Sequence, residues 1–63
     1  MRVLKLVGVD KVEAGDNLIL NGVNYTCEYV EYDGIAFDLQ LHDAEGNKVR
    51  KTLIAGEQVS LAI

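Results

Sequence analysis

The chain has 63 residues, which allow one small domain over residues 1–63, and a domain of this size buries only about 60% of its unfolded surface. Hydrophobic residues make up 49% of the sequence and charged residues 25%, a globular balance that excludes a disordered tail, a collagen-like repeat and a low-complexity linker. Six Lys and Arg against ten Asp and Glu give a net charge of -4, which repels a phosphate backbone and argues against non-specific nucleic-acid binding.

The predicted elements begin with a strand over residues 3–9, which are apolar except at Lys5 and Gly8. The charge and the glycine interrupt this stretch, and it is too short for the hydrophobic part of a signal peptide or for a membrane span. We therefore expect no contact with a membrane and a cytoplasmic location.

A charge-rich segment at residues 10–16 predicts a solvated loop, and a strand over residues 17–20 follows it. The next dipeptide, Asn21-Gly22, has two residues that tolerate the positive φ of a type I′ turn. It therefore predicts a tight hairpin that leads into a second strand.

The strand after this turn changes the parity of its apolar residues. Odd positions are apolar over residues 23–29, whereas Val30 and Tyr32 are apolar at even positions. Successive side chains of a strand point to opposite faces, so an uninterrupted strand would expose one of the two sets. One extra residue where the parity changes keeps both sets on the core side and places Cys27 opposite Leu41. The sequence predicts a β-bulge that bends this strand.

The dipeptide Asp33-Gly34 predicts a second type I′ turn, which pairs Tyr32 with Ile35. Residues 35–42 then show the cleanest alternation in the chain, with apolar odd positions and polar even positions. We expect this strand to be the central core element, with Ile35 on its core side.

Residues 43–47 predict a hairpin loop into a further strand. Pairing across this loop places Leu41 opposite Val49, a sensible contact between apolar side chains. The same register leaves Lys51 opposite Leu39 as its one mismatch.

A tight turn at residues 55–57 leads to the last predicted strand, residues 59–63, which is apolar at its odd positions. A terminal strand of this kind is normally held in a sheet, and we place it beside the strand over residues 3–9, where it closes a barrel. The fold class predicted is all-β: a small barrel of five or six strands with a bulged, bent central strand.

Residues 14–30 carry a resemblance to a known family. Gly15-Asp16 precedes a strand, Gly22 lies in the turn, and a second strand follows. This arrangement resembles the opening hairpin of SH3-like barrels of the KOW and translation-protein kind. The resemblance implies an SH3-like barrel fold.

The residue types that most often carry chemistry are scarce. His42 is the only histidine and lies on the polar face of its strand, with no expected nucleophile in reach. Cys27 is the only cysteine, points to the predicted core and has Glu28 beside it, which raises its pKa. One His and one Cys do not make a zinc site, and isolated turn glycines do not make a phosphate-binding loop. We expect no enzymatic activity, no metal and no cofactor.

An acidic, tyrosine-containing patch is predicted on the bulged hairpin. Such a surface suits a basic protein partner, although the same residues also suit a solvated face that keeps a small domain soluble. The preferred hypothesis is a non-enzymatic module that binds a protein, of the kind found among small phage or bacterial accessory and inhibitor proteins. The residues of the predicted patch are Glu28, Tyr29, Glu31, Tyr32, Asp33 and Asp38.

Two alternatives remain open. Lys48, Arg50 and Lys51 share one strand, and cations beside an aromatic side chain bind single-stranded nucleic acid, an alternative that the net charge disfavours. The same cations also suit a surface that discourages aggregation. In the second alternative, the strand over residues 3–9 or the last strand completes a sheet in another copy and makes a structural homo-oligomer.

Overall fold

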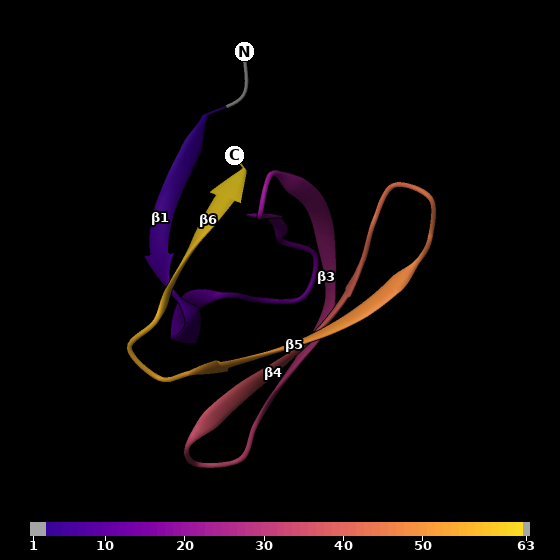
Figure 1. Cartoon of the computed structure of the whole chain (residues 1–63). Helices are drawn as coiled ribbons and strands as arrows, with labels where there is room; N and C mark the ends of the chain where they lie inside the picture. Colours follow the sequence, from indigo (N-terminus) through magenta and orange to yellow (C-terminus); the bar gives the residue numbers. More distant parts are fainter. Residues whose placement is uncertain (1–2, 63) are drawn as a thin grey trace.

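The computed structural model describes residues 3–62 as one antiparallel sheet with a short 3₁₀ turn, η1 (Figure 1). The strands run in the order β1-β6-β2-β3-β4-β5 across the sheet. The all-β prediction and its upper strand count are confirmed. The elements in chain order are β1 (Leu4–Gly8), η1 (Val9–Lys11), β2 (Asn17–Leu20), β3 (Val23–Tyr32), β4 (Ala36–His42), β5 (Lys48–Ile54) and β6 (Gln58–Ala62).

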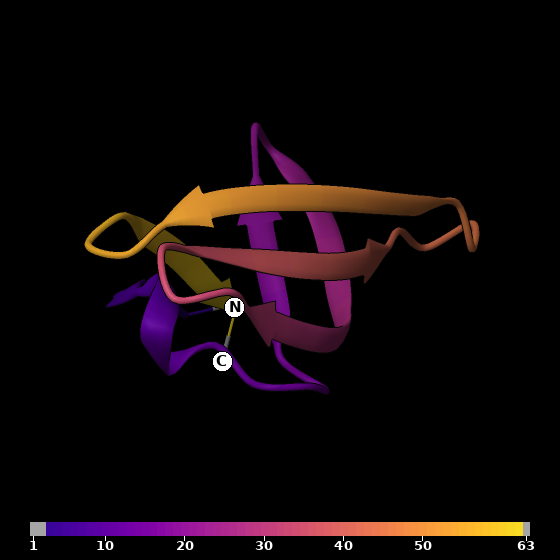
Figure 2. The same ribbon diagram turned by 90° about the horizontal axis from the view of Figure 1, so that it is seen from below.

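The long strand β3 belongs to two halves of the sheet. Its first part pairs with β2 and its second part with β4, and Thr26 is opposite both Asn17 and His42. The strands β4 and β5 consequently run across the direction of β2 and the start of β3 (Figure 2). This bend brings the apolar sides of the two halves together.

A β-bulge lies where β3 passes from one half to the other. Cys27 is opposite Leu41 and Tyr29 is opposite Gln40, so Glu28 is the extra residue. The predicted bulge and the predicted Cys27–Leu41 pairing are both confirmed. The bulge restores the parity, and it directs Cys27 and Val30 to the same apolar side.

The two short turns have different outcomes. Asn21 and Gly22 have φ values of 51° and 78°, so the predicted type I′ turn is confirmed. The prediction for Asp33-Gly34 is wrong, because only Gly34 has a positive φ in this turn and Tyr32 pairs with Phe37 rather than with Ile35.

Side-chain hydrogen bonds explain the wider turn. One carboxylate oxygen of Asp33 accepts from the backbone N–H of Ile35 at 2.9 Å and of Ala36 at 2.8 Å. These bonds hold the chain in an Asx-type turn, so Ile35 lies in the connection. Ile35 is exposed, and the expectation that it faces the core is wrong.

The last strand lies beside the first, as predicted, with Leu4 opposite Ala62 and Gly8 opposite Gln58. Ile63 of the predicted strand lies outside the described residues. β6 also pairs with β2, so it occupies the place between β1 and β2. Within residues 3–62 no ladder joins β1 to β5, and the sheet has two edges where the prediction had a closed barrel.

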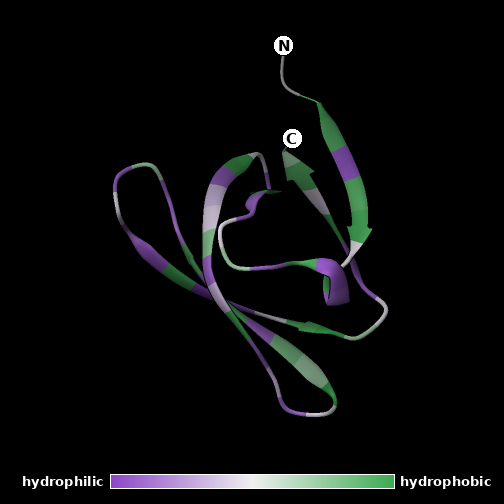
Figure 3. Ribbon diagram, turned by 180° about the vertical axis from the view of Figure 1, so that it is seen from behind, coloured by the Kyte–Doolittle hydropathy of each residue, from purple (hydrophilic) through white to green (hydrophobic). Residues whose placement is uncertain are grey.

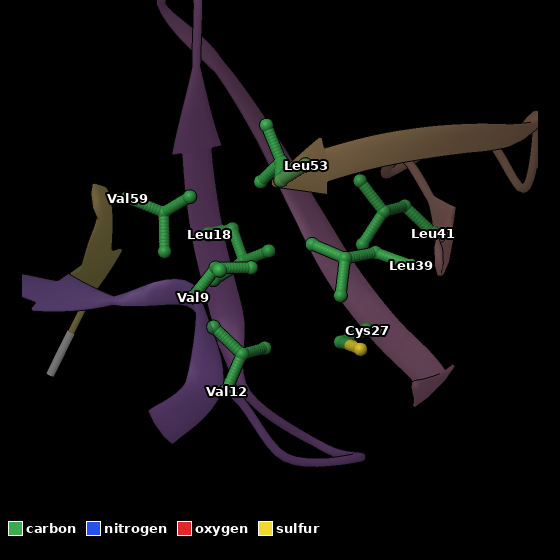
Figure 4. Close-up of a cluster of buried hydrophobic side chains, with 8 residues drawn as sticks. All are labelled: Val9, Val12, Leu18, Cys27, Leu39, Leu41, Leu53 and Val59. Carbon is green, nitrogen blue, oxygen red and sulfur yellow. The ribbon is translucent and has the colours of Figure 1, made fainter. Parts of the chain in front are cut away.

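The core fills the space between the two halves of the sheet (Figure 4). Leu18, Leu39 and Leu41 are its largest fully buried side chains. Val12 is also buried, which corrects the expectation that residues 10–16 form an entirely solvated loop. The complete buried set is Val9, Val12, Leu18, Cys27, Leu39, Leu41, Leu53 and Val59.

This core makes a stability prediction. We expect Leu39→Ala to lower the free energy of unfolding by about 2–5 kcal/mol, because it removes a fully buried side chain from a central strand and leaves a cavity. Ile35→Ala is the control and should change that free energy by less than about 0.5 kcal/mol, because its side chain is exposed. Urea unfolding followed by circular dichroism measures both. Equal losses at the two positions would contradict the placement of Leu39 in the core.

Candidate functional site

The outer face of β3, β4 and β5 gathers most of the residues singled out in the sequence. Leu39 and Leu41 point to the core, so the even-numbered residues of β4 point outward. Three rows of opposed residues cross this face: Glu31–Asp38–Thr52, Tyr29–Gln40–Arg50 and Thr26–His42–Lys48.

The bulged residue Glu28 is held by two neighbours on this face. Its Oε2 atom lies 3.7 Å from Nδ1 of His42, and its Oε1 atom lies 3.8 Å from Nζ of Lys48. The Oε2 atom is buried and accepts no hydrogen bond within the described chain. Glu28 therefore forms an ion pair with Lys48 and lies beside His42, and it does not present a free carboxylate to a partner.

Arg50 lies on the same face as the acidic residues Asp38 and Glu31. Its Nη2 group donates a hydrogen bond of 3.4 Å to the hydroxyl of Tyr29. This bond, followed by electrostatic interactions with Tyr29, Asp38 and Glu31, raises the pKa of the Arg50 guanidinium. Asp38 also accepts a hydrogen bond of 2.6 Å from the hydroxyl of Thr52. Glu31 and Asp38 lie opposite each other, and the charges of both act on Arg50.

The predicted acidic patch is thus divided. Glu28, Tyr29, Glu31 and Asp38 share the outer face, and Asp33 lies in the turn. Tyr32 lies on the opposite face, where its ring stacks on that of Phe37 at a centroid distance of 4.4 Å.

The predicted basic set is divided as well. Lys48 and Arg50 lie on the outer face opposite His42 and Gln40. Lys51 lies opposite Leu39, as the register predicted, and so occupies the other face of β5. The three cations do not form one patch.

The structure shows an exposed apolar cluster that the sequence analysis missed, at the tip of the β3–β4 hairpin. The hairpin projects from the body in Figure 1, and hydrophobic colouring reaches this end of it in Figure 3. Tyr32 is 56% exposed, Ile35 73% and Ile54 60%. The turn brings the end of β5 to the same place, because the N–H of Ala55 donates to the carbonyl of Ile35 at 3.4 Å. We call this set, Tyr32, Ile35, Phe37 and Ile54, the tip cluster. Tyr32 and Phe37 lie on the core side of their strands, Ile54 is opposite Ala36 on the outer side, and Ile35 lies in the connection between β3 and β4.

Acidic residues surround the tip cluster. Glu31 precedes Tyr32 and points to the outer face opposite Asp38, and Asp33 forms the turn beside Tyr32. A carboxylate oxygen of Glu57 accepts a hydrogen bond of 2.6 Å from the backbone N–H of Ile54. Lys48 and Arg50 lie at the other end of β5 or beside Tyr29, and Lys51 lies on the face of Tyr32 and Phe37, one row away from them. The acidic rim of the tip therefore has a cation beside it.

The chemistry of the remaining candidates is limited. Burial raises the pKa of the Cys27 thiol, and the negative charges of Asp16 and Glu28 raise it further. The raised pKa keeps the thiol protonated and therefore unreactive. Among residues 3–62 no group of three or more His, Cys, Asp or Glu side chains is placed to hold a metal ion. A shallow cleft of about 520 Å³ lies beside the β4–β5 loop, with Asn17, Thr26, His42 and Asp43 among its lining residues.

The chain matches no protein-family model, and neither characterised proteins nor solved structures show significant similarity to it. In the described part of the chain, no helix has the length and apolar character that crossing a membrane requires.

Two loop carboxylates predict how stability depends on pH. Hydrogen bonds, first from Ala36 N–H, lower the pKa of Asp33 below its ordinary value of 3.8, and bonds led by the Asn47 side chain do the same for Asp43. A lowered folded pKa means that the stabilisation is complete above the ordinary value and is lost as pH falls through the folded value. We expect the free energy of unfolding to fall in this acidic range.

Urea unfolding at a series of acidic pH values tests this expectation. The double variant Asp33→Asn with Asp43→Asn should show a flatter acid limb, because neither amide titrates. An unchanged acid limb would contradict the assignment to these two residues.

Proposed function

We propose that this chain is a non-enzymatic interaction module, built as an open small barrel of the SH3-like kind, whose tip cluster binds a basic protein partner. The observation that carries the proposal is the exposure of Tyr32 and Ile35 at the end of the projecting β3–β4 hairpin and of Ile54 at the adjoining end of β5. Contiguous exposed apolar groups rimmed by polar residues are typical of protein-binding sites.

The tip is suited to act as a binding anchor. The ring of Tyr32 is already stacked on Phe37, and its hydroxyl donates a hydrogen bond of 2.9 Å to the carbonyl of Gly34. The turn below it is held by the carboxylate of Asp33. A side chain that is fixed before binding loses less conformational entropy in the complex, which favours affinity.

The charge around the tip defines the chemistry of the partner. Asp33 and Glu57 lie beside the apolar side chains of the tip, Glu31 lies on the outer face next to them in the chain, and the whole chain carries a net charge of -4. A partner that offers an apolar pocket with Lys or Arg at its rim would be attracted over a distance and oriented on contact. This proposal keeps Glu31, Tyr32 and Asp33 of the predicted patch and adds Ile35 and Ile54.

Selection from a random peptide library tests this proposal without knowledge of the natural partner. We expect the peptides selected by the wild-type chain to combine aromatic or aliphatic residues with Lys and Arg. The variant Tyr32→Ala with Ile35→Ala should bind them at least about tenfold more weakly, because it removes two anchors. Val23→Ala, which truncates an exposed side chain at another turn, is the matched control.

The salt dependence of peptide binding gives a second readout. Affinity measured by titration calorimetry should fall as the salt concentration rises, because salt screens the attraction between the acidic rim and the peptide. Selected peptides without basic residues, or equal binding by the tip variant, would contradict the proposal.

A further inference from the structure

The outer face of β1, β6 and β2 differs from the rest of the surface because it carries no charge within the described residues. Leu4 is opposite Ala62, and Leu6 is opposite Ser60, while Asn17 and Ile19 of β2 face Ala62 and Ser60 from the other side. Val7, Leu18, Val59 and Leu61 point to the core, so the alternate residues point outward. We call this surface, Leu4, Leu6, Asn17, Ile19, Ser60 and Ala62, the neutral face.

The neutral face ends at an open strand edge. In residues 3–62 β1 pairs with β6 and with no other strand, so one side of its backbone lacks a ladder. Leu4 is 54% exposed and Leu6 is 61% exposed at this edge. Lys5 points to the other side of the sheet, because it is opposite Leu61 and alternates with the two leucines. An exposed apolar edge strand is a template for pairing with another strand.

We propose that two copies of this chain associate through their β1 strands, which pair antiparallel about a twofold axis and join the two neutral faces into one continuous surface. Symmetry favours a second copy as the occupant, because an exposed edge strand whose outward residues are apolar and uncharged then meets an identical one. Each chain carries a net charge of -4, so two copies repel wherever their charged surfaces approach. At the neutral face they meet without placing like charges together, whereas a basic partner finds no carboxylate there.

Antiparallel pairing of one strand with its own copy satisfies twofold symmetry, because the same residues serve both sides of the contact. Residues that are directly opposite each other across antiparallel strands have their side chains on the same face of the sheet. A twofold axis perpendicular to the sheet therefore passes between two copies of the same residue. An axis at Lys5 would put the two ammonium groups opposite each other, which is destabilising. An axis at Leu6 pairs Leu6 with Leu6, Leu4 with Gly8, and Lys5 with Val7, and it moves the two ammonium groups to diagonal positions, where their repulsion is weaker.

Sedimentation of the full chain over a wide dilution series tests the proposal. We expect a concentration-dependent dimer, and Leu6→Lys should weaken the association at least about tenfold, because it puts a charge in the contact. Ile54→Lys is the matched control, since Ile54 is 60% exposed and lies in the tip cluster, and it should leave the dimer unchanged. A monomer at every concentration, or a dimer that Leu6→Lys leaves intact, overturns the proposal.

Salt distinguishes this contact from the proposed tip complex. Raising the salt concentration should strengthen the dimer, because it screens the repulsion between two acidic chains and has no ion pair to weaken. The peptide complex at the tip should respond in the opposite direction, so either proposal can fail without the other. Dimerisation that weakens as salt rises contradicts a contact through the neutral face.

Hydrogen exchange of the wild-type chain covers the case in which Leu6→Lys fails to fold. The backbone N–H groups of β1 should exchange more slowly as the protein concentration rises, because dimerisation pairs the free edge. Exchange of β1 that does not depend on concentration overturns the proposal.

Discussion

The fold depends on the bulge at Glu28, because it lets one strand serve two halves of the sheet. Before the bulge Cys27 faces the core opposite Leu41, and after it Val30 faces the core opposite Leu39. Without the extra residue, one of these two sets would point to solvent, and the core would lose half of its lining from β3. The bulge also directs Glu28 and Tyr29 outward together, where they contact His42, Lys48 and Arg50. One inserted residue therefore determines both the core and the polar outer face.

Charged residues are arranged differently on the outer face and at the tip. On the outer face, acidic residues of β3 and β4 lie within reach of the cations of β5, and the two sets offset each other. Such exposed pairs contribute little to stability, but they leave few carboxylates free for a partner. At the tip no cation is paired with Asp33 or Glu57 in the described contacts, and both carboxylates accept hydrogen bonds from the backbone there. These two residues therefore place negative charge beside the exposed apolar residues of the tip.

The features that follow from side-chain alternation could be predicted from the sequence. The bulge, the Cys27–Leu41 pairing and the position of Lys51 opposite Leu39 all follow from the period of two. Features that depend on a single side-chain hydrogen bond could not be predicted. Asp33 binds two backbone N–H groups, widens the turn and exposes Ile35, and hydropathy alone contains no sign of this. The pairing of β6 with β2 as well as β1 is a long-range contact, so the open edge was also beyond local patterns. For the candidate site, the sequence identified Tyr32 and its acidic neighbours. It also predicted separate acidic and basic patches, whereas the structure places acidic and basic residues side by side on the outer face.

The two proposed surfaces differ in a way that makes their combination informative. The tip cluster and β1 lie at separate places on the molecule, so one contact does not block the other (Figure 1). A twofold dimer through β1 would display two copies of the tip cluster, and a partner with two binding sites at a matching distance would bind with avidity. The linkage also works in reverse, because a bivalent partner bound to both tips would stabilise the β1 contact. A small chain with a weak tip and a weak edge could in this way bind tightly, through the geometry of two contacts rather than the strength of one.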